Sequence, residues 1–139
     1  MPSDIRPKLL GYEISTDAVS RGALVTTVLA VPLGVVAGRV LADGSAWNSA
    51  VTIGIFAAFM LGGAVAGRIR PDTPGLHGAL AALPCLLLLT FIRLLLALFG
   101  DIDFAPNLIL SQIVIGTSLA TIGGVVAARR ADRGHSLVD

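Results

Sequence analysis

The chain has 139 residues, of which 55% are hydrophobic and 14% are charged, and its formal net charge is +1. A soluble domain usually carries about 25% charged residues, so this composition argues against a soluble globular protein. The low charge and four long apolar segments together place the chain in a lipid bilayer.

Each apolar segment holds about 19 to 23 residues, enough to cross a hydrocarbon core about 30 Å thick at 1.5 Å per residue. Irregular backbone cannot face lipid, so we expect all four segments to be α-helices. The sequence thus predicts an all-α membrane protein, with a four-helix transmembrane domain between a cytoplasmic lead and a cytoplasmic tail. In chain order, these parts are the lead at 1–20, the domain at 21–130 with spans at 21–42, 49–67, 77–99 and 107–128, and the tail at 131–139.

The lead ends in a signal for the start of a helix. Ser15 or Thr16 can cap a helix, and Asp17 is favourable in its first turn. Upstream of this signal, apolar side chains lie close to Arg6 and Lys8. The lead can therefore rest on the inner membrane surface or form a loosely ordered tail.

Positive side chains lie before the first span and after the second and fourth spans, whereas the loops after the first and third spans are acidic or neutral. Since positive residues stay in the cytoplasm, we expect both termini and the loop at 68–76 to be inside. The abundance of arginine, alanine and glycine favours a bacterial plasma membrane. The arginines expected to contact anionic lipid there, each gaining roughly 1 kcal/mol, are Arg68, Arg70, Arg129, Arg130 and Arg133.

Two pairs of similar stretches suggest an internal repeat. The second and fourth spans both end with a Gly-Gly pair, small residues and arginines, and the first and third begin with Gly-Ala-Leu after Arg21 or His77. This pattern predicts two parallel-related helical hairpins, an arrangement that occurs in some transporters. The alternative is convergence in composition between helices rich in glycine and alanine.

Small residues recur every four positions in three of the spans. Such stripes let helix backbones approach closely in lipid, which offers no hydrophobic drive for association. The third span is rich in leucine instead, so we expect spans one, two and four to make the tight contacts and span three to face lipid or a partner. The residues predicted to pack helices together are Gly34, Gly38, Gly63, Gly67, Gly116, Ala120 and Gly124.

The segment between the predicted hairpins, GGAVAGRIRPDTPGLHGALAALPCLLL, is the most distinctive text in the chain. It resembles the YrzE-like group of small four-helix bacterial membrane proteins, in which a Gly-Gly-x-x-x-Gly helix end leads through a short basic loop into a glycine-containing helix start. The four-span layout extends the resemblance over residues 21–130. The resemblance implies the architecture and no activity, since that group has none assigned. The matching positions are Gly62, Gly63, Gly67, Arg68, Gly75, His77, Gly78, Gly123 and Gly124.

Candidate catalytic groups are scarce in this sequence. The spans contain no Asp, Glu or His at mid-depth, and the chain carries no metalloprotease motif, acid pair, Ser/His/Asp set or phosphate-binding loop. The single cysteine, Cys85, excludes a cysteine metal cluster. We therefore predict no catalytic residue, no cofactor and no metal. The enzymatic alternative is an acid–base group of Asp72, Thr73 and His77, although a turn with His77 in the headgroup zone explains these residues more simply.

Apart from Arg21 at the start of the first span, Arg39 and Arg93 are the charged residues within the spans, and both lie near the outer side. An arginine at mid-membrane costs about 2.5–3.5 kcal/mol on insertion scales, but its long side chain can snorkel to the boundary. We therefore expect both arginines to be outer-leaflet anchors paired with loop carboxylates. Asp43 follows Arg39 by one helical turn, and Asp101 and Asp103 lie in the loop after Arg93.

A second interpretation places both arginines in one outward-facing pocket. Thr90 lies one turn before Arg93, while Ser111 and Gln112 enter at the same depth from the fourth span. Two guanidinium groups at low dielectric would favour an anionic headgroup or a carboxylate. A third interpretation is that Arg93 meets an acidic residue of another protein across the leucine-rich face.

These observations favour a non-enzymatic small integral membrane protein that acts as an accessory or assembly subunit of a membrane complex, because the chain has almost no mass outside the membrane. The alternative is a small oligomeric transporter or channel for an anionic solute or lipid. The expected partners are membrane lipids and either other membrane subunits or further copies of the chain, with no nucleic acid.

Overall fold

The structure is a computed structural model that describes residues 8–9, 11–39, 46–99 and 106–135. Its described part contains a short hairpin followed by four long helices. The hairpin pairs β1 (Lys8–Leu9) with β2 (Tyr12–Glu13), and the helices are α1 (Thr16–Arg39), α2 (Ala46–Ile69), α3 (Pro74–Leu98) and α4 (Pro106–His135). All four helices are long and apolar enough to span a membrane, which confirms the predicted helical class and the presence of four helices of this kind.

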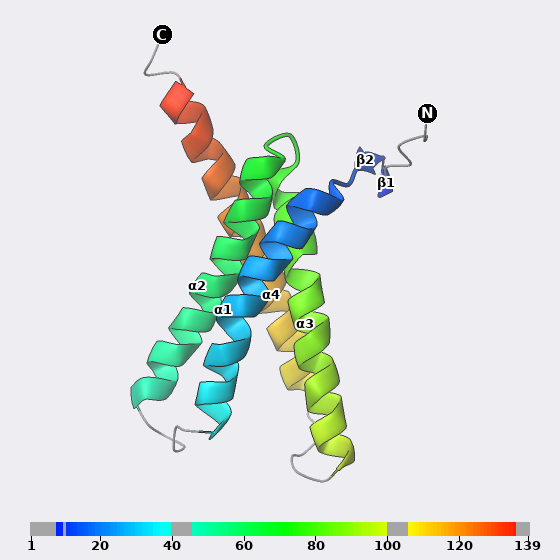
Figure 1. Cartoon of the computed structure of the whole chain (residues 1–139), viewed down its shortest axis with the longest axis vertical. Helices are drawn as coiled ribbons and strands as arrows, with labels where there is room; N and C mark the ends of the chain where they lie inside the picture. The colour runs from blue at the N-terminus through cyan, green and yellow to red at the C-terminus, as the bar shows by residue number, and fades with distance from the viewer. Residues whose placement is uncertain (1–7, 10, 40–45, 100–105, 136–139) are drawn as a thin grey trace.

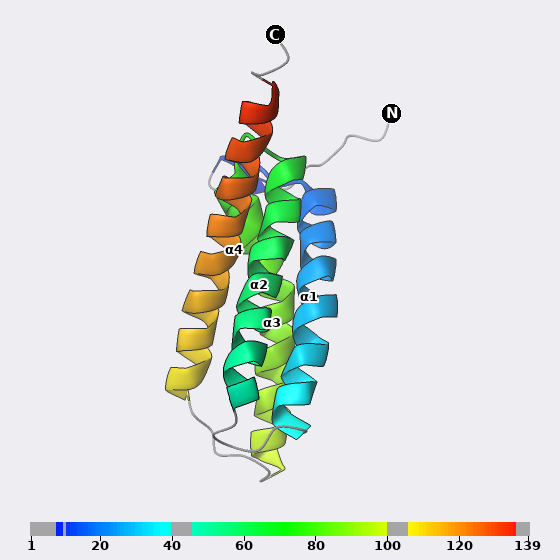
Figure 2. The same cartoon turned by 90° about the vertical axis from the view of Figure 1, so that its left-hand side faces the viewer.

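The start of α1, the turn at residues 70–73 between α2 and α3, and the end of α4 lie at one end of the molecule (Figures 1 and 2). We call this the turn end, and the other the opposite end. Both α2 and α3 contact each of the other three helices, whereas α1 and α4 do not touch each other in the described part of the chain. The expectation that the third span is peripheral to tight packing among the other three is therefore wrong. The first turns of α3 carry small residues that admit close neighbours.

The closest approach between helices joins α2 to α4. A Cβ atom added to Gly63 would overlap the backbone carbonyl of Ala120, and one added to Gly123 would overlap the carbonyl of Met60. Only a residue without a side chain lets two helix backbones meet at this separation, which is how membrane helices gain packing energy where lipid supplies no hydrophobic drive. Four of the residues predicted to pack helices lie in this interface: Gly63, Gly67, Ala120 and Gly124.

The remaining predicted packing positions differ from one another. A Cβ atom at Gly116 would lie 3.0 Å from the Leu86 side chain and 3.3 Å from that of Phe59, so this glycine also faces a neighbouring helix. A Cβ atom at Gly34 would meet nothing within 4 Å. The packing role predicted for Gly34 is therefore not seen among the described residues, and Gly38 lies outside the side chains that the structure describes.

Burial is confined to the part of each helix that is nearer the turn end. A compact cluster there contains Ala30, Ala58, Phe59, Ala82, Cys85, Leu86 and Ala120. Towards the opposite end, no described side chain is buried at 31–36 of α1, 47–57 of α2, 87–99 of α3 or 106–115 of α4. The lower ends of α2 and α3 also spread apart in Figure 1. The apolar side chains of these segments are therefore left to lipid or to another protein.

The start of α1 follows the predicted signal. The Oγ of Ser15 accepts a hydrogen bond from the backbone N–H of Ala18 at 3.3 Å, which confirms Ser15 as the cap. Asp17, in the first turn, pairs with Arg21 at 2.9 Å. The short hairpin just before this cap was not predicted, and it turns at Gly11, whose φ of 84° is one that glycine adopts freely.

The end of α4 lies well beyond the boundary expected from hydropathy. The helix continues to His135, through the arginines that follow the apolar segment and into the predicted tail. Alanine and arginine are strong helix formers, and neither proline nor glycine interrupts the helix between Gly124 and Gly134. Hydropathy therefore marks the depth of the bilayer and not the length of the helix.

Candidate functional site: the His77 junction

One side chain at the turn end combines full burial with ionisable chemistry. His77 lies in the first turn of α3 and is 0% exposed. The helix starts there because Pro74, which suits the first helical position, follows the N-cap Thr73, and the N–H of His77 makes the first-turn bond to the carbonyl of Thr73 at 3.2 Å. This geometry directs the imidazole into the packed end of the bundle.

The Nε2 atom of His77 accepts a hydrogen bond from the backbone N–H of Ser15, at 3.0 Å and across 62 positions of sequence. A backbone N–H can only donate, so this nitrogen carries no proton. In the neutral ring the proton must then be on Nδ1, which lies 3.0 Å from the carbonyl oxygen of Thr73 and 2.9 Å from its Oγ1. Both ring nitrogens are therefore committed to hydrogen bonds within the protein.

The bond from Ser15 to His77 completes the cap of α1. In a capping box, the third residue of the helix sends a side chain back to the N–H of the capping residue. The third residue of α1 is Ala18, which has no polar side chain. The imidazole of α3 supplies the missing acceptor, so one side chain joins the N-terminal caps of α1 and α3.

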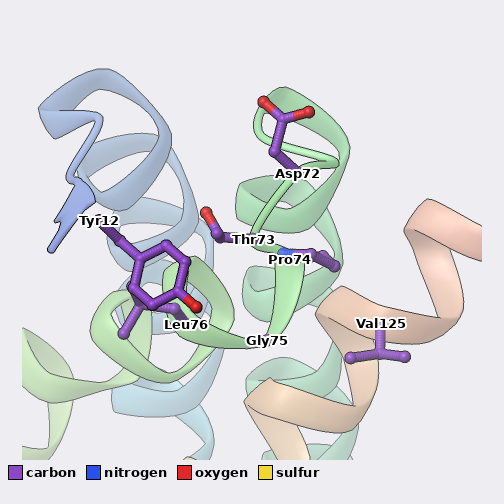
Figure 3. A pocket seen from close by; sticks show the side chains of 7 residues that line it. All are labelled: Tyr12, Asp72, Thr73, Pro74, Gly75, Leu76 and Val125. Carbon is purple, nitrogen blue, oxygen red and sulfur yellow. The ribbon is translucent and has the colours of Figure 1, made fainter. Parts of the chain in front are cut away.

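An open hollow of about 340 Å³ lies beside this junction. It is bounded by the hairpin, the start of α3 and one residue of α4. In Figure 3 the carboxylate of Asp72 points away from the Tyr12 ring, and Val125 stands on the far side of the α3 start from that ring. Because Tyr12 of the hairpin is one of its lining residues, the shape of the hollow depends on the position of the hairpin. Its lining residues are Tyr12, Asp72, Thr73, Pro74, Gly75, Leu76 and Val125.

Both ring nitrogens of His77 make hydrogen bonds at the starts of two helices. The lone pair of Nε2 is occupied by the Ser15 N–H, and Nδ1 faces Thr73. Of the proposed acid–base group, Thr73 and His77 are brought together, whereas Asp72 is exposed at the hollow. Within the described ranges, no group of three or more His, Cys, Asp or Glu side chains is placed to hold a metal ion.

The residues of the predicted outer pocket are only partly described. Arg93 is exposed on α3, Thr90 and Gln112 are half-buried, and Ser111 is exposed, with its Oγ–H donating to the carbonyl of Leu108 at 2.9 Å. The side chain of Arg39, together with Asp43, Asp101 and Asp103, lies outside the described residues. A shared arginine pocket therefore stays a prediction.

The arginines predicted to meet inner-leaflet lipid belong to the turn end. Arg68, Arg129, Arg130 and Arg133 are exposed, at the ends of α2 and α4. Arg70 is half-buried, and its Nε is enclosed without a hydrogen-bond partner among the described residues. Four of these five side chains are thus exposed and Arg70 is exposed in part, and their contact with lipid stays a prediction.

Sequence reasoning missed the partnership between His77 and Ser15. Each residue carries a local signal, a helix cap in one case and a histidine one turn after a proline in the other, but the bond between them depends on tertiary packing. Comparisons of the chain with models of protein families, with curated proteins and with solved structures give no match.

Proposed function

We propose that this protein is a small, non-enzymatic, multi-pass protein of a bacterial plasma membrane that acts as an accessory or assembly subunit of a membrane complex. The observation that supports this most is the uneven burial of its helices. The turn end is tightly packed, while long segments of all four helices towards the opposite end bury no described side chain. A chain built in this way can hold its own fold at one end and offer the other to a partner.

Arg93 lies within this open region. It is exposed on α3, between the exposed apolar side chains of Phe91 and Leu94. A guanidinium keeps its charge under all physiological conditions, so within apolar surroundings it needs a carboxylate, a lipid headgroup or water. An acidic residue on a partner helix would satisfy it and would also fix the register of the association.

Replacing Arg93 by leucine is expected to weaken assembly roughly tenfold or more, because a partner's acidic residue would lose its counter-charge. The size of the complex extracted from native membranes, measured on blue-native gels, checks this result. Arg93→Lys should retain most of the assembly, and Arg129→Leu, which removes an exposed arginine at the turn end, should retain all of it. A complex of unchanged size for Arg93→Leu would contradict the proposal. Altered anion flux in liposomes with intact assembly would favour the transporter instead.

The orientation of the chain in the membrane is inferred from the positions of its positively charged residues. We propose that the turn end, with its arginines, faces the cytoplasm, and that α1–α2 and α3–α4 form two parallel-related hairpins. The hydrogen-bonded start of α1 and the arginine-bearing ends of α2 and α4 share that end. The glycine pairs that join α2 to α4 occupy similar positions in the two proposed hairpins.

Reporter fusions test this orientation. A fluorescent protein fused after the end of α4 should fold and fluoresce, while alkaline phosphatase at the same position should be inactive, because the cytoplasm keeps its thiols reduced. Alkaline phosphatase inserted between α3 and α4 should give the reverse result. Active phosphatase after α4 would contradict the proposed topology.

A further inference from the structure

We propose that His77 is a protonation-sensitive tie that holds the N-terminal segment, the β1–β2 hairpin and Ser15, against the start of α3. With a neutral ring the segment is docked. With a protonated ring the bond to Ser15 is lost and the segment is released. This inference concerns the turn end and is independent of the proposed association through the opposite end.

The donor pattern at the ring carries the argument. The Ser15 N–H, 3.0 Å from Nε2, needs a lone pair on that nitrogen. Protonation would replace the lone pair with a second N–H, so that two donors would face each other. The bond from Nδ1 to Thr73 would survive, since that nitrogen donates in either state. Only the tie to α1 depends on the charge of the ring.

Burial makes the loss consequential. The imidazole is 0% exposed and lies within the apolar span that begins at Pro74. The second N–H of a protonated ring would need an acceptor within the protein, or water admitted by a movement of the chain. Movement of the N-terminal segment would admit water to Nε2, because Ser15 at the end of that segment lies directly against this nitrogen. Docking therefore requires the neutral ring, because the Ser15 N–H uses the lone pair of Nε2.

Other titratable or charged side chains lie at the turn end near His77, on the hairpin, α1, α2, the turn at 70–73 and α4. Asp17 pairs with Arg21, and both are exposed, at 59% and 66% of the side chain. The remaining groups are exposed or half-buried. These groups are Tyr12 and Glu13 on the hairpin, Arg68 on α2, Arg70 and Asp72 in the turn, and Arg129 and Arg130 on α4. The test therefore has to separate the titration of His77 from theirs.

Release would also remodel the hollow. Tyr12 forms one wall of it, and Thr73, whose two oxygens contact the ring, forms another. Detaching the segment at Ser15 would move Tyr12 away from the start of α3 and expose the first turn of that helix. Protonation of His77 would thus change the surface that the bundle exposes at the turn end.

Amide hydrogen exchange of the full chain in lipid nanodiscs tests the proposal. The Ser15 amide is followed between about pH 7.5 and about pH 5.5, the interval in which histidine side chains change charge, and each rate is corrected with an unstructured peptide of the same sequence. In the wild type, protection of Ser15 should fall by about tenfold or more, the effect of one lost hydrogen bond. In His77→Gln, whose amide oxygen accepts a hydrogen bond and does not titrate, protection should be independent of pH.

Two results would overturn the proposal. The first is wild-type protection that stays constant over the whole interval, and the second is an equal loss of protection in His77→Gln, which would assign the effect to another group. If His77→Gln does not fold, the ¹⁵N shifts of the wild-type imidazole decide. The proposal requires an unprotonated Nε2 at the higher pH and a doubly protonated ring when protection is lost, and a proton on Nε2 at the higher pH would refute it.

Discussion

Replacing Gly63 by alanine is expected to destabilise the protein by about 1–3 kcal/mol or more, whereas the same change at Gly34 should leave its stability nearly unchanged. The added methyl at Gly63 would overlap the carbonyl of Ala120 and lie 2.6 Å from the carbonyl carbon. These are backbone atoms of α4 that no rotamer change can move. The two helices would therefore have to separate along their closest contact, and the packing gained by every neighbouring turn would weaken.

Gly34 provides the matched control. It lies in a helix and begins a Gly-x-x-x-Gly motif of the same form as that of Gly63, but a methyl there meets nothing within 4 Å. Unfolding of both variants by SDS in detergent micelles, followed by far-ultraviolet circular dichroism, gives the comparison. Equal midpoints for the two variants would show that α2 and α4 do not approach as closely as described.

Replacing His77 by alanine is expected to destabilise the protein by about 1–3 kcal/mol at neutral pH, because a half-buried N–H donor would be left without its acceptor. The Ser15 N–H would lose its acceptor, since Ala18 cannot replace it. The space vacated by a fully buried ring would add to this loss. The change should also free the N-terminal segment, so trypsin should cut after Lys8 faster than in the wild type.

The conservative variant separates these effects. His77→Gln keeps an acceptor and much of the side-chain volume, so it should recover part of the stability and most of the resistance to trypsin. The same SDS titration and a time course of limited proteolysis provide both readouts. An alanine variant as stable and as resistant as the wild type would remove His77 from any role in holding the segment.

The spans were predictable because each is set by local composition. A run of apolar residues about as long as a bilayer is thick has few alternatives to a helix, and the cap at Ser15 is encoded by adjacent residues. The helix ends were less predictable. The α4 helix runs on to His135 because residues that favour a helix follow those that favour lipid.

Tertiary partners could not be predicted in the same way. Gly34-x-x-x-Gly38 and Gly63-x-x-x-Gly67 are the same sequence motif. A Cβ atom at Gly34 would meet nothing within 4 Å, however, while one at Gly63 would overlap the backbone of α4. The hydrogen bond between Ser15 and His77 could not be predicted, because the two residues are 62 positions apart in the sequence. The candidate outer site around Arg93 rests on the same kind of long-range information.

Native mass spectrometry of the intact protein, released directly from its own membrane, tests the central claim that the opposite end is a surface for association. The account predicts that the 14.2 kDa chain is carried mainly in assemblies that contain at least one further protein subunit. A spectrum in which the chain is found only as a monomer with lipids would contradict it.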